Sequence, residues 1–299
     1  MAEQSRPKVI YVMGAGRSGS TVLGVALGNC ENVFFAGELD KWLVRRGAPH
    51  LADDERMRFW SGVREQVDAA DLFGGQAHRC LERSSALFRV RDWSARRRVR
   101  PRYRRVSEDV YKAVARAAGV THLVDTSHYP LRARELQALD GVDLYLLFLV
   151  RHPQSVVASL DRRDVAERRF GMLTANAYLW LTQLVSVLVF LRHPRERRLF
   201  VRHEDFLADP QGVLRQILDM TGSSAPIPDL GELRTGIPLH GNRLVNSEVI
   251  ALQPDAPLPH RPSAMTSLLQ LSWRAVLPRL RPAVTAGKVH KRRPAPGSG

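Results

Sequence analysis

The chain has 299 residues, with 45 Lys and Arg against 30 Asp and Glu, so its formal net charge at pH 7 is +15. This length suits one large domain with a substantial core, and the basic excess favours anionic ligands or partners. The two cysteines, Cys30 and Cys80, exclude a disulfide scaffold or a cysteine-rich metal site. The start of the chain does not read as a secretory signal, so a cytoplasmic location is expected.

A glycine-rich loop follows the first predicted strand, residues 8–13. The apolar run ends at Gly14, the loop reads Gly16-Arg17-Ser18-Gly19-Ser20-Thr21, and apolar residues resume at helical spacing from Val22. This order predicts a phosphate cradle, because the first N–H groups of a helix have no partner within it. Loops that bind nucleoside triphosphates place a lysine where this chain has Ser20, and the only cation here is Arg17. We expect the loop to bind a phosphate group without handling a nucleoside triphosphate in the usual way; a simple glycine turn is the alternative.

Two further predicted strands, 32–36 and 121–125, end in residues that can move protons. Gly37 and Glu38 follow the first strand, and Asp125-Thr126-Ser127-His128 end the second. Glu38 is a candidate general base if its surroundings tune its pKa, or else a solvated carboxylate that pairs with Lys41 or Arg45 at helical spacing. His128 could act as an acid or base near neutral pH, or be an exposed loop residue.

The strand predicted at 143–150 leads into a second candidate phosphate site. Its nearly unbroken apolar run is typical of a strand buried on both faces of a parallel sheet. Arg151 follows it, Pro153 can begin a helix, and Ser159 lies on the second turn of that helix. An arginine fork and a hydroxyl donor suit a phosphate group, whereas the alternative is a surface arginine at a strand end.

The remaining segments complete an α/β pattern. Residues 172–191 contain no charged side chain and are long enough to cross a membrane, but their polar residues and the strand expected at 198–202 favour a buried core helix. Strands therefore alternate with helices along the chain. This pattern predicts an α/β fold, with a P-loop-like, mostly parallel sheet flanked by helices and a ligand site at the carboxyl ends of its strands.

The two candidate phosphate sites together resemble those of sulfotransferases that use 3′-phosphoadenosine 5′-phosphosulfate (PAPS), in the bacterial and tyrosylprotein branch. Residues 16–21 are similar to the family's 5′-phosphosulfate loop, and Arg151 with Ser159 to its R-x-P-x-x-x-x-x-S site for the 3′-phosphate. Gly37-Glu38 resembles the family's G-E element, and residues 125–128 its D-S-S-K element with His128 in place of the lysine. Residues 203–210 resemble a Y-E-D-L-x-x-x-P segment, and His240-Gly241-Asn242-Arg243 a shortened H-x-x-x-G-N-x-x-R stretch.

The resemblance implies roles for these residues. The PAPS-binding set would be Gly16, Arg17, Ser18, Gly19, Ser20, Thr21, Arg151 and Ser159, with Gly241 and Arg243 closing over the nucleotide. Glu38 would take the proton of an acceptor hydroxyl or amine, with His128 as the second candidate, while Arg17 would stabilise charge on the leaving group. No metal is expected, and small-molecule, carbohydrate and lipid acceptors all remain open.

The expected organisation is a single sulfotransferase domain over residues 1–277. A helical insertion at about 41–115 would cover the acceptor pocket, and a basic tail at 278–299 is expected to be disordered.

Two other functions fit parts of the sequence. A phosphotransferase would use the same glycine-rich loop, with Asp125 as its metal-binding carboxylate. A non-catalytic protein that binds nucleic acid or an anionic membrane would use the arginine-rich segment 89–105, which also contains Trp93 and Tyr103. For this segment, peripheral membrane contact is favoured over nucleic acid, and a merely solvated basic face is the alternative.

Overall fold

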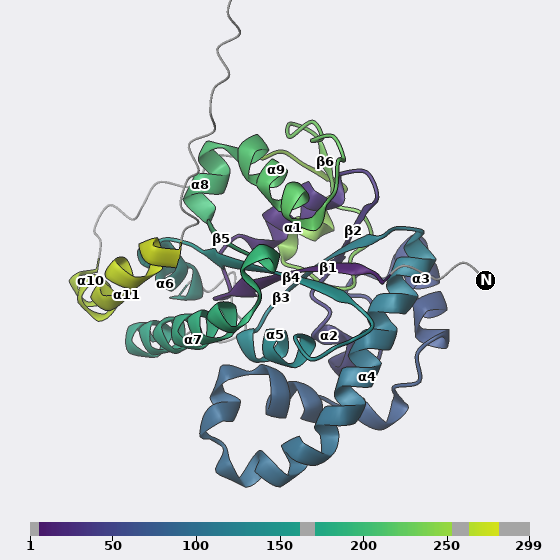
Figure 1. Ribbon diagram of the computed structural model, residues 1–299, viewed down its shortest axis with the longest axis horizontal. Helices are drawn as coiled ribbons and strands as arrows, with labels where there is room; N and C mark the ends of the chain where they lie inside the picture. Colours follow the sequence, from purple (N-terminus) through teal and green to yellow (C-terminus); the bar gives the residue numbers. More distant parts are fainter. Residues whose placement is uncertain (1–5, 162–170, 253–262, 281–299) are drawn as a thin grey trace, which may run out of the picture.

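Five parallel strands form the centre of the protein in the computed structural model, which describes residues 6–161, 171–252 and 263–280. They are β1 (Lys8–Gly14), β2 (Val33–Gly37), β3 (His122–His128), β4 (Asp143–Val150) and β5 (Arg198–Arg202), in the spatial order β2-β3-β1-β4-β5. Every neighbouring pair runs parallel. All five strands lie where the sequence predicts them, and the predicted P-loop-like α/β fold is confirmed (Figure 1).

Helices cover both faces of this sheet (Figure 1). The helices are α1 (Ser20–Gly28), α2 (Lys41–Val44), α3 (Asp54–Glu65), α4 (Trp93–Ala118), α5 (Pro130–Leu136), α6 (Pro153–Asp161), α7 (Met172–Arg192), α8 (His203–Ala208), α9 (Pro210–Thr221), α10 (Ala264–Leu269) and α11 (Leu271–Val276). Side chains alternate along the strands: Ile10 and Val12 belong to the core beneath α1 and α9, whereas Tyr11 and Met13 belong to the core beneath α4, α5 and α7. A sheet buried on both faces explains the unbroken apolar run of β4.

Helix α7 is a core helix, as its sequence predicts. It contacts β1, β4, α5 and α6, and its polar residues Asn176, Thr182 and Gln183 are buried within the protein. In the described part of the chain it is the one helix long and apolar enough to span a bilayer, and 56% of its most apolar stretch is buried.

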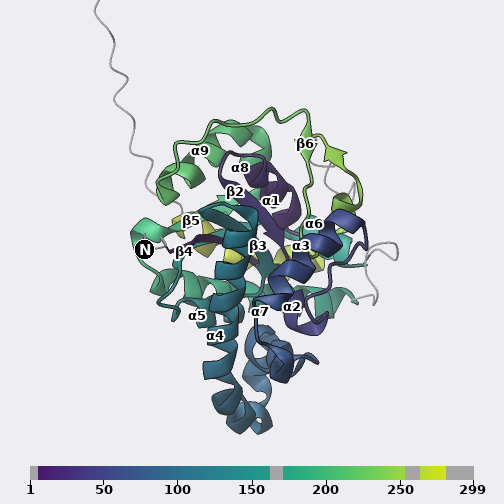
Figure 2. The same cartoon turned by 90° about the vertical axis from the view of Figure 1, so that its right-hand side faces the viewer.

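The segment between β2 and β3 is helical. After α2 and α3 come four short turns, η1 (Ala70–Leu72), η2 (His78–Glu82), η3 (Ser84–Phe88) and η4 (Val90–Asp92), and then the 26-residue helix α4. Figure 2 shows the short turns and the first part of α4 projecting away from the sheet. We call residues 78–98 of this projection the arm.

Several short elements complete the described chain. These are η5 (Arg195–Arg197), the two-residue strands β6 (Leu233–Arg234) and β7 (Val249–Ile250), η6 (Arg243–Asn246) and η7 (Leu277–Leu280). The small antiparallel β6–β7 pair was not predicted, because two-residue strands leave no periodic pattern. Of the predicted tail, residues 278–280 belong to η7 and residues 281–299 lie outside the described residues.

Candidate active site

The strand order places a switch point between β1 and β4. From β1 the chain crosses toward β2, and from β4 it crosses the other way toward β5. In parallel α/β sheets, ligands bind at the carboxyl ends of the strands at such a point. The glycine-rich loop follows β1 and Arg151 follows β4, so both candidate phosphate sites lie on this seam.

Backbone geometry explains the glycines of the loop. A Cβ on Gly14 would lie 2.2 Å from the carbonyl oxygen of Leu149 on β4, and a Cβ on Gly19 would lie 2.3 Å from the imidazole ring of His203. Gly19 also has φ +88°, and the non-glycine Arg17 has φ +71°, a conformation that L-residues adopt rarely and at a cost. The loop is therefore fixed in one shape by close packing on β4 and α8.

Some polar groups of the loop are hydrogen-bonded within the protein, and others are available to bind a ligand. The Gly16 N–H donates to Tyr178 Oη at 3.1 Å. Ser18 is buried, and its Oγ has no hydrogen-bond partner among the residues that the structure describes. A buried hydroxyl without a partner at a helix N-terminus is typical of a site that binds an anion.

Arg151 joins the two candidate phosphate sites. Its guanidinium donates to the carbonyl oxygen of Arg17 at 3.5 Å, and the backbone N–H of the next residue, His152, donates to Glu204 Oε1 at 2.6 Å. The segment 203–210 therefore contacts both the glycine-rich loop and the end of β4. His203 packs against Gly19, and Glu204 accepts the hydrogen bond from His152.

The remaining predicted nucleotide residues lie on neighbouring elements. Ser159 is half-buried on α6, the helix that begins at Pro153. Gly241 is buried, and the exposed Arg243 begins η6, which contacts α1. Ser20 and Thr21 form the first turn of α1. The pairing of Ser159 with Arg151 remains a prediction from the sequence spacing.

A cavity of about 330 Å³ adjoins Arg151 between the ends of β4 and β5 and helix α11. Arg151, Arg202 and Arg274 contribute to its wall. Two buried polar atoms of α11 and the residue before it, Trp273 Nε1 and Gln270 Oε1, have no hydrogen-bond partner within the described ranges. Arg151 therefore adjoins a cavity whose wall combines three arginines with apolar side chains such as Phe200 and Leu277.

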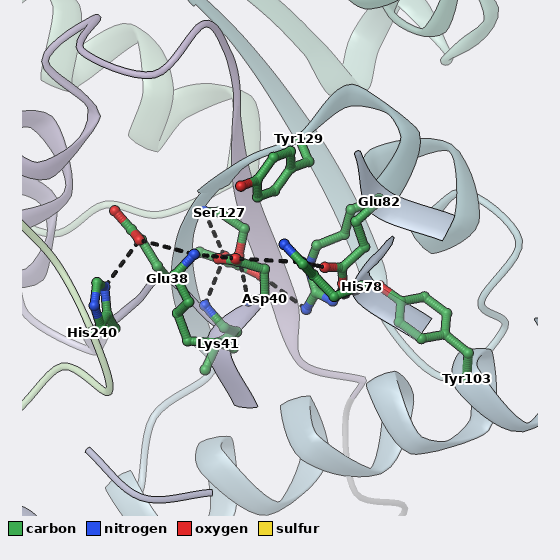
Figure 3. Close-up of polar contacts among 12 residues, drawn as sticks. Glu38, Asp40, Lys41, His78, Glu82, Tyr103, Ser127, Tyr129 and His240 are labelled. Carbon is green, nitrogen blue, oxygen red and sulfur yellow. Dashed lines mark hydrogen bonds and ion pairs between the residues drawn. The ribbon is translucent and has the colours of Figure 1, made fainter. Parts of the chain in front are cut away.

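Glu38 lies at the carboxyl end of β2 and is held from several sides (Figure 3). Its Oε2 lies 3.0 Å from His240 Nδ1 and 4.0 Å from Lys41 Nζ, and its N–H donates to the His240 carbonyl at 2.9 Å. Burial alone would raise the pKa of Glu38, but the hydrogen bond with His240 and the charge of Lys41 outweigh it and lower the pKa to about 2. Glu38 is therefore ionised at neutral pH, and His240 is the donor in their hydrogen bond.

His128 lies between Glu38 and the glycine-rich loop. It has φ +57°, its ring packs on Tyr129 with the centroids 4.3 Å apart, and its Nε2 is 3.8 Å from the position of a Cβ on Gly16. Burial lowers the pKa of His128 to about 4, so its imidazole is neutral at pH 7 and can accept a proton but not supply one.

Asp125 holds the Glu38 turn in place. Its carboxylate accepts hydrogen bonds from Tyr111 Oη at 2.6 Å, from the Ser127 N–H at 2.9 Å and from the Leu39 N–H at 3.4 Å. It also accepts from the Ser127 hydroxyl and faces Arg132 at 3.3 Å. Both oxygens are thereby engaged, which makes Asp125 an architectural residue.

A buried polar cluster beside Glu38 was not predicted from the sequence (Figure 3). His78 Nδ1 lies 2.5 Å from Glu82 Oε2 and 3.8 Å from Asp40 Oδ2, and Asp40 also pairs with Lys41 at 2.8 Å. Burial raises the pKa of Asp40 to about 7 despite Lys41. Burial would also raise the pKa of Glu82, but His78, Arg132 and Tyr103 outweigh it and lower that pKa to about 2.

The ligand atoms of Asp40, His78 and Glu82 lie within 4.8 Å of one another, a spacing that could hold a metal ion. Lys41 and Arg132 already neutralise the two carboxylates, however, and Tyr103 donates to Glu82. The cluster is therefore better described as a charge-balanced network that fixes the arm beside the Glu38 turn, with Asp40 Oδ1 the buried oxygen that has no hydrogen-bond partner among the described residues. His78 and Glu82 lie four residues apart on η2, but Asp40 and Arg132 join them only through tertiary packing, which the sequence does not indicate.

Comparisons with known proteins give a family match and similar solved structures. The profile described as the sulfotransferase family matches residues 7–226, which include the loop, Glu38 and Arg151. No functionally curated sequence matches the chain.

Among solved structures, the chain is similar to the sulfotransferase domain from the curacin biosynthetic pathway, with 19% identity and a TM-score of 0.51 over 90% of this chain and 98% of that one. It is also similar to the sulfotransferase domain of the Synechococcus PCC 7002 olefin synthase, with 20% identity and a TM-score of 0.54 over 91% of this chain and 96% of that one. At these identities the two structures support the fold, and the profile match over most of the chain supports the family. The chain therefore belongs to the sulfotransferase family.

Proposed function

We propose that this chain transfers a sulfuryl group from PAPS to a hydroxyl or amine of a small-molecule, carbohydrate or lipid acceptor. The observation that carries the proposal is the contact of Arg151 with the carbonyl of Arg17, 3.5 Å apart. It brings an arginine and a glycine-rich loop together at one seam of the sheet, which suits a donor with phosphate groups at two positions.

The loop residues would hold the 5′ end of the donor. Backbone N–H groups of residues 18–21 and the dipole of α1 favour negative charge, and the unpartnered Ser18 Oγ can donate one more hydrogen bond. Arg17 adds a permanent cation. Arg151 and Ser159 would bind the 3′-phosphate, and Gly241 and Arg243, on the segment that contacts α1, would close over the nucleotide.

Glu38 would take the acceptor proton. As the bond between the acceptor atom and sulfur forms, the bond from sulfur to the bridging oxygen breaks, and the electron pair leaves with the 5′-phosphate of the nucleotide. The helix N-terminus and Arg17 would stabilise that developing charge. Glu38 is ionised, as a proton acceptor must be, and its carboxylate is oriented by His240, but its lowered pKa makes it a weak base in the absence of substrate. The neutral His128 is the second candidate base.

We further propose that the helical insertion at 41–115 forms the wall of the acceptor pocket. Lys41, the first residue of this insertion, lies 4.0 Å from Glu38, and the arm residues His78 and Glu82 lie close to the adjacent Asp40. The acceptor would therefore be chosen by this segment rather than by the sheet.

A phosphotransferase is the less favoured reading of the same loop. It would need a cation at the Ser20 position and a carboxylate free to hold a metal. Asp125, the residue that would supply the carboxylate, has both oxygens engaged by Ser127, Tyr111, Leu39 and Arg132.

The proposal is tested by following label from radiolabelled PAPS into fractionated metabolites, with wild type and Arg17→Ala. We expect transfer by the wild type, and a loss of at least about 100-fold in Arg17→Ala while adenosine 3′,5′-bisphosphate still binds. Arg195→Ala, an exposed arginine of η5, is the matched control and should transfer normally. Near-normal turnover in Arg17→Ala would contradict the mechanism, and stabilisation by ADP with magnesium but not by the bisphosphate would favour phosphotransfer.

A further inference from the structure

The tip of the arm exposes a group of large apolar side chains. Phe88, Val90 and Trp93 are exposed to 71%, 68% and 54%, and Leu87 to 36%. They come from three consecutive elements, η3, η4 and the start of α4, on the part of the molecule that projects away from the sheet (Figure 2). Neighbouring exposed apolar residues on a projection are typical of an interaction surface.

Arginines surround this apolar group. Residues 83–98 contain six arginines and a single acidic residue, Asp92. Of the arginines, Arg83, Arg91, Arg97 and Arg98 are exposed, Arg89 is half-buried, and Arg96 is buried with a hydrogen bond to the Ala86 carbonyl. The tip of the arm is therefore both apolar and strongly cationic.

The structure separates this tip from the rest of the arginine-rich segment. Farther along α4, Arg102 pairs with Asp68 and Asp71, and Arg100 and Arg104 pair with the buried Glu135. Those arginines fasten α4 to its neighbours. The arginines of the predicted segment 89–105 therefore fall into two groups. Those at 100, 102 and 104 are structural, and those up to residue 98 belong to a surface region that begins at about residue 83.

We propose that the tip of the arm, residues 83–98, docks on an anionic lipid surface. Aromatic and aliphatic side chains would enter the boundary between headgroups and acyl chains, and the flanking arginines would contact the negative headgroups. A second copy of this chain fits less well, because it would bring two sets of arginines together. Nucleic acid fits less well too, because half of the exposed apolar group, Leu87 and Val90, is aliphatic and only Phe88 and Trp93 offer rings on which a base can stack.

This inference goes beyond the proposed function and does not depend on it. The arm residues His78 and Glu82 bind Asp40 and Arg132 next to the Glu38 turn, so docking of the tip would hold the candidate active site close to the membrane.

The test is co-sedimentation of the full chain with vesicles of phosphatidylcholine alone and of phosphatidylcholine mixed with phosphatidylglycerol. We expect binding to the mixed vesicles that weakens as salt rises. Two double variants, Phe88→Ser with Trp93→Ser and Arg97→Glu with Arg98→Glu, should each reduce the partition coefficient at least about tenfold. All four side chains are exposed, so the melting temperatures should stay near that of the wild type.

Matched controls keep the result specific to the tip. Leu268→Ser with Leu271→Ser removes two exposed leucines of α10 and α11, and Arg192→Glu with Arg195→Glu removes the same charge elsewhere. Both controls should bind like the wild type. Equal binding to both kinds of vesicle, unchanged binding by the tip variants, or tight binding of a single-stranded oligonucleotide without vesicle binding would overturn the proposal.

Discussion

At the scale of single residues, Glu38 is ionised and immobilised by groups from distant parts of the chain. His240 contacts its carboxylate from 202 positions away, Lys41 lies 4.0 Å from it, and Asp125 fixes the next residue through the Leu39 N–H. A proton acceptor held in this way loses little orientational freedom when an acceptor molecule binds. Glu38 is therefore the residue whose replacement should separate chemistry from binding.

Glu38→Gln keeps the shape of the side chain and removes its ability to take a proton. We expect kcat for sulfuryl transfer to fall at least about 100-fold, with the dissociation constant for adenosine 3′,5′-bisphosphate nearly unchanged. Steady-state kinetics and calorimetric titration measure the two quantities. Glu31→Gln, at an exposed position before β2, is the control and should leave both unchanged. A Glu38→Gln protein with near-normal kcat would make His128 the better candidate base.

Asp40 gives a pH dependence of stability that can be measured without any substrate. Because burial raises its pKa to about 7, folding favours the protonated form, so its contribution to stability is full below its ordinary pKa of about 4 and is lost as the pH rises through 7. Asp40→Asn cannot ionise and should melt above the wild type at about pH 8, with a smaller difference at about pH 5.

Thermal unfolding followed by circular dichroism over that range measures this difference. Glu38 and Glu82 have lowered pKa values, so their contribution to stability is lost as the pH falls. Both carboxylates are present in wild type and in Asp40→Asn, so this loss does not affect the difference between the two proteins. Asp54→Asn, an exposed residue of α3, is the control. If the difference in melting temperature between Asp40→Asn and wild type were the same at every pH, it would contradict the claim that folding raises the pKa of Asp40.

At the scale of elements, helix α8 sets the shape of the glycine-rich loop. His203, its first residue, occupies the space that a side chain on Gly19 would need, and Glu204 binds the backbone that follows Arg151. The loop, β4 and α8 therefore form one packed unit, and a disturbance at one of them should reach the others.

Gly19→Ala tests this packing. A Cβ there has both an unfavourable φ and a 2.3 Å approach to His203, so we expect a loss of roughly 2–4 kcal/mol in the free energy of unfolding. Adding His203→Ala should recover the part of the lost free energy of unfolding that the steric clash causes. The part caused by the unfavourable φ should remain. Denaturant unfolding of the single and double variants gives both parts. Gly62→Ala, where a Cβ would meet nothing within 4 Å, is the control, and an equally mild effect at Gly19 would contradict this account.

Elements with strong local patterns were predictable from the sequence, and contacts made by tertiary packing were not. The apolar run of β4 and the glycines after β1 announce a strand and a loop, and parallel topology then requires Arg151 and the loop to share one edge. In the cluster of Asp40, His78 and Glu82, the last two form a pair four residues apart on η2, and only tertiary packing brings Asp40 to them. The pairing of His240 with Glu38 spans most of the chain, so a motif could name both residues without indicating that they touch.

At the scale of the whole molecule, the candidate donor site, the Glu38 turn and the arm follow one another across the protein. The donor site lies between β1 and β4, Glu38 lies at the end of the edge strand β2, and the arm projects from the segment that follows (Figures 1 and 2). Two of the regions that contribute to the net charge of +15 have different expected partners. Around Arg17 and Arg151 the positive charge suits an anionic donor, and at the tip of the arm it suits an anionic surface.

We propose that Arg151 and the glycine-rich loop bind the two phosphate groups of one nucleotide. Calorimetric titration of wild type and Arg151→Ala with adenosine 3′,5′-bisphosphate and with adenosine 5′-phosphate tests it most directly. We predict that the wild type binds the bisphosphate about 10- to 100-fold more tightly than the monophosphate, and that Arg151→Ala removes most of this difference. Equal affinity of the wild type for the two nucleotides, or an unchanged preference in Arg151→Ala, would contradict the claim.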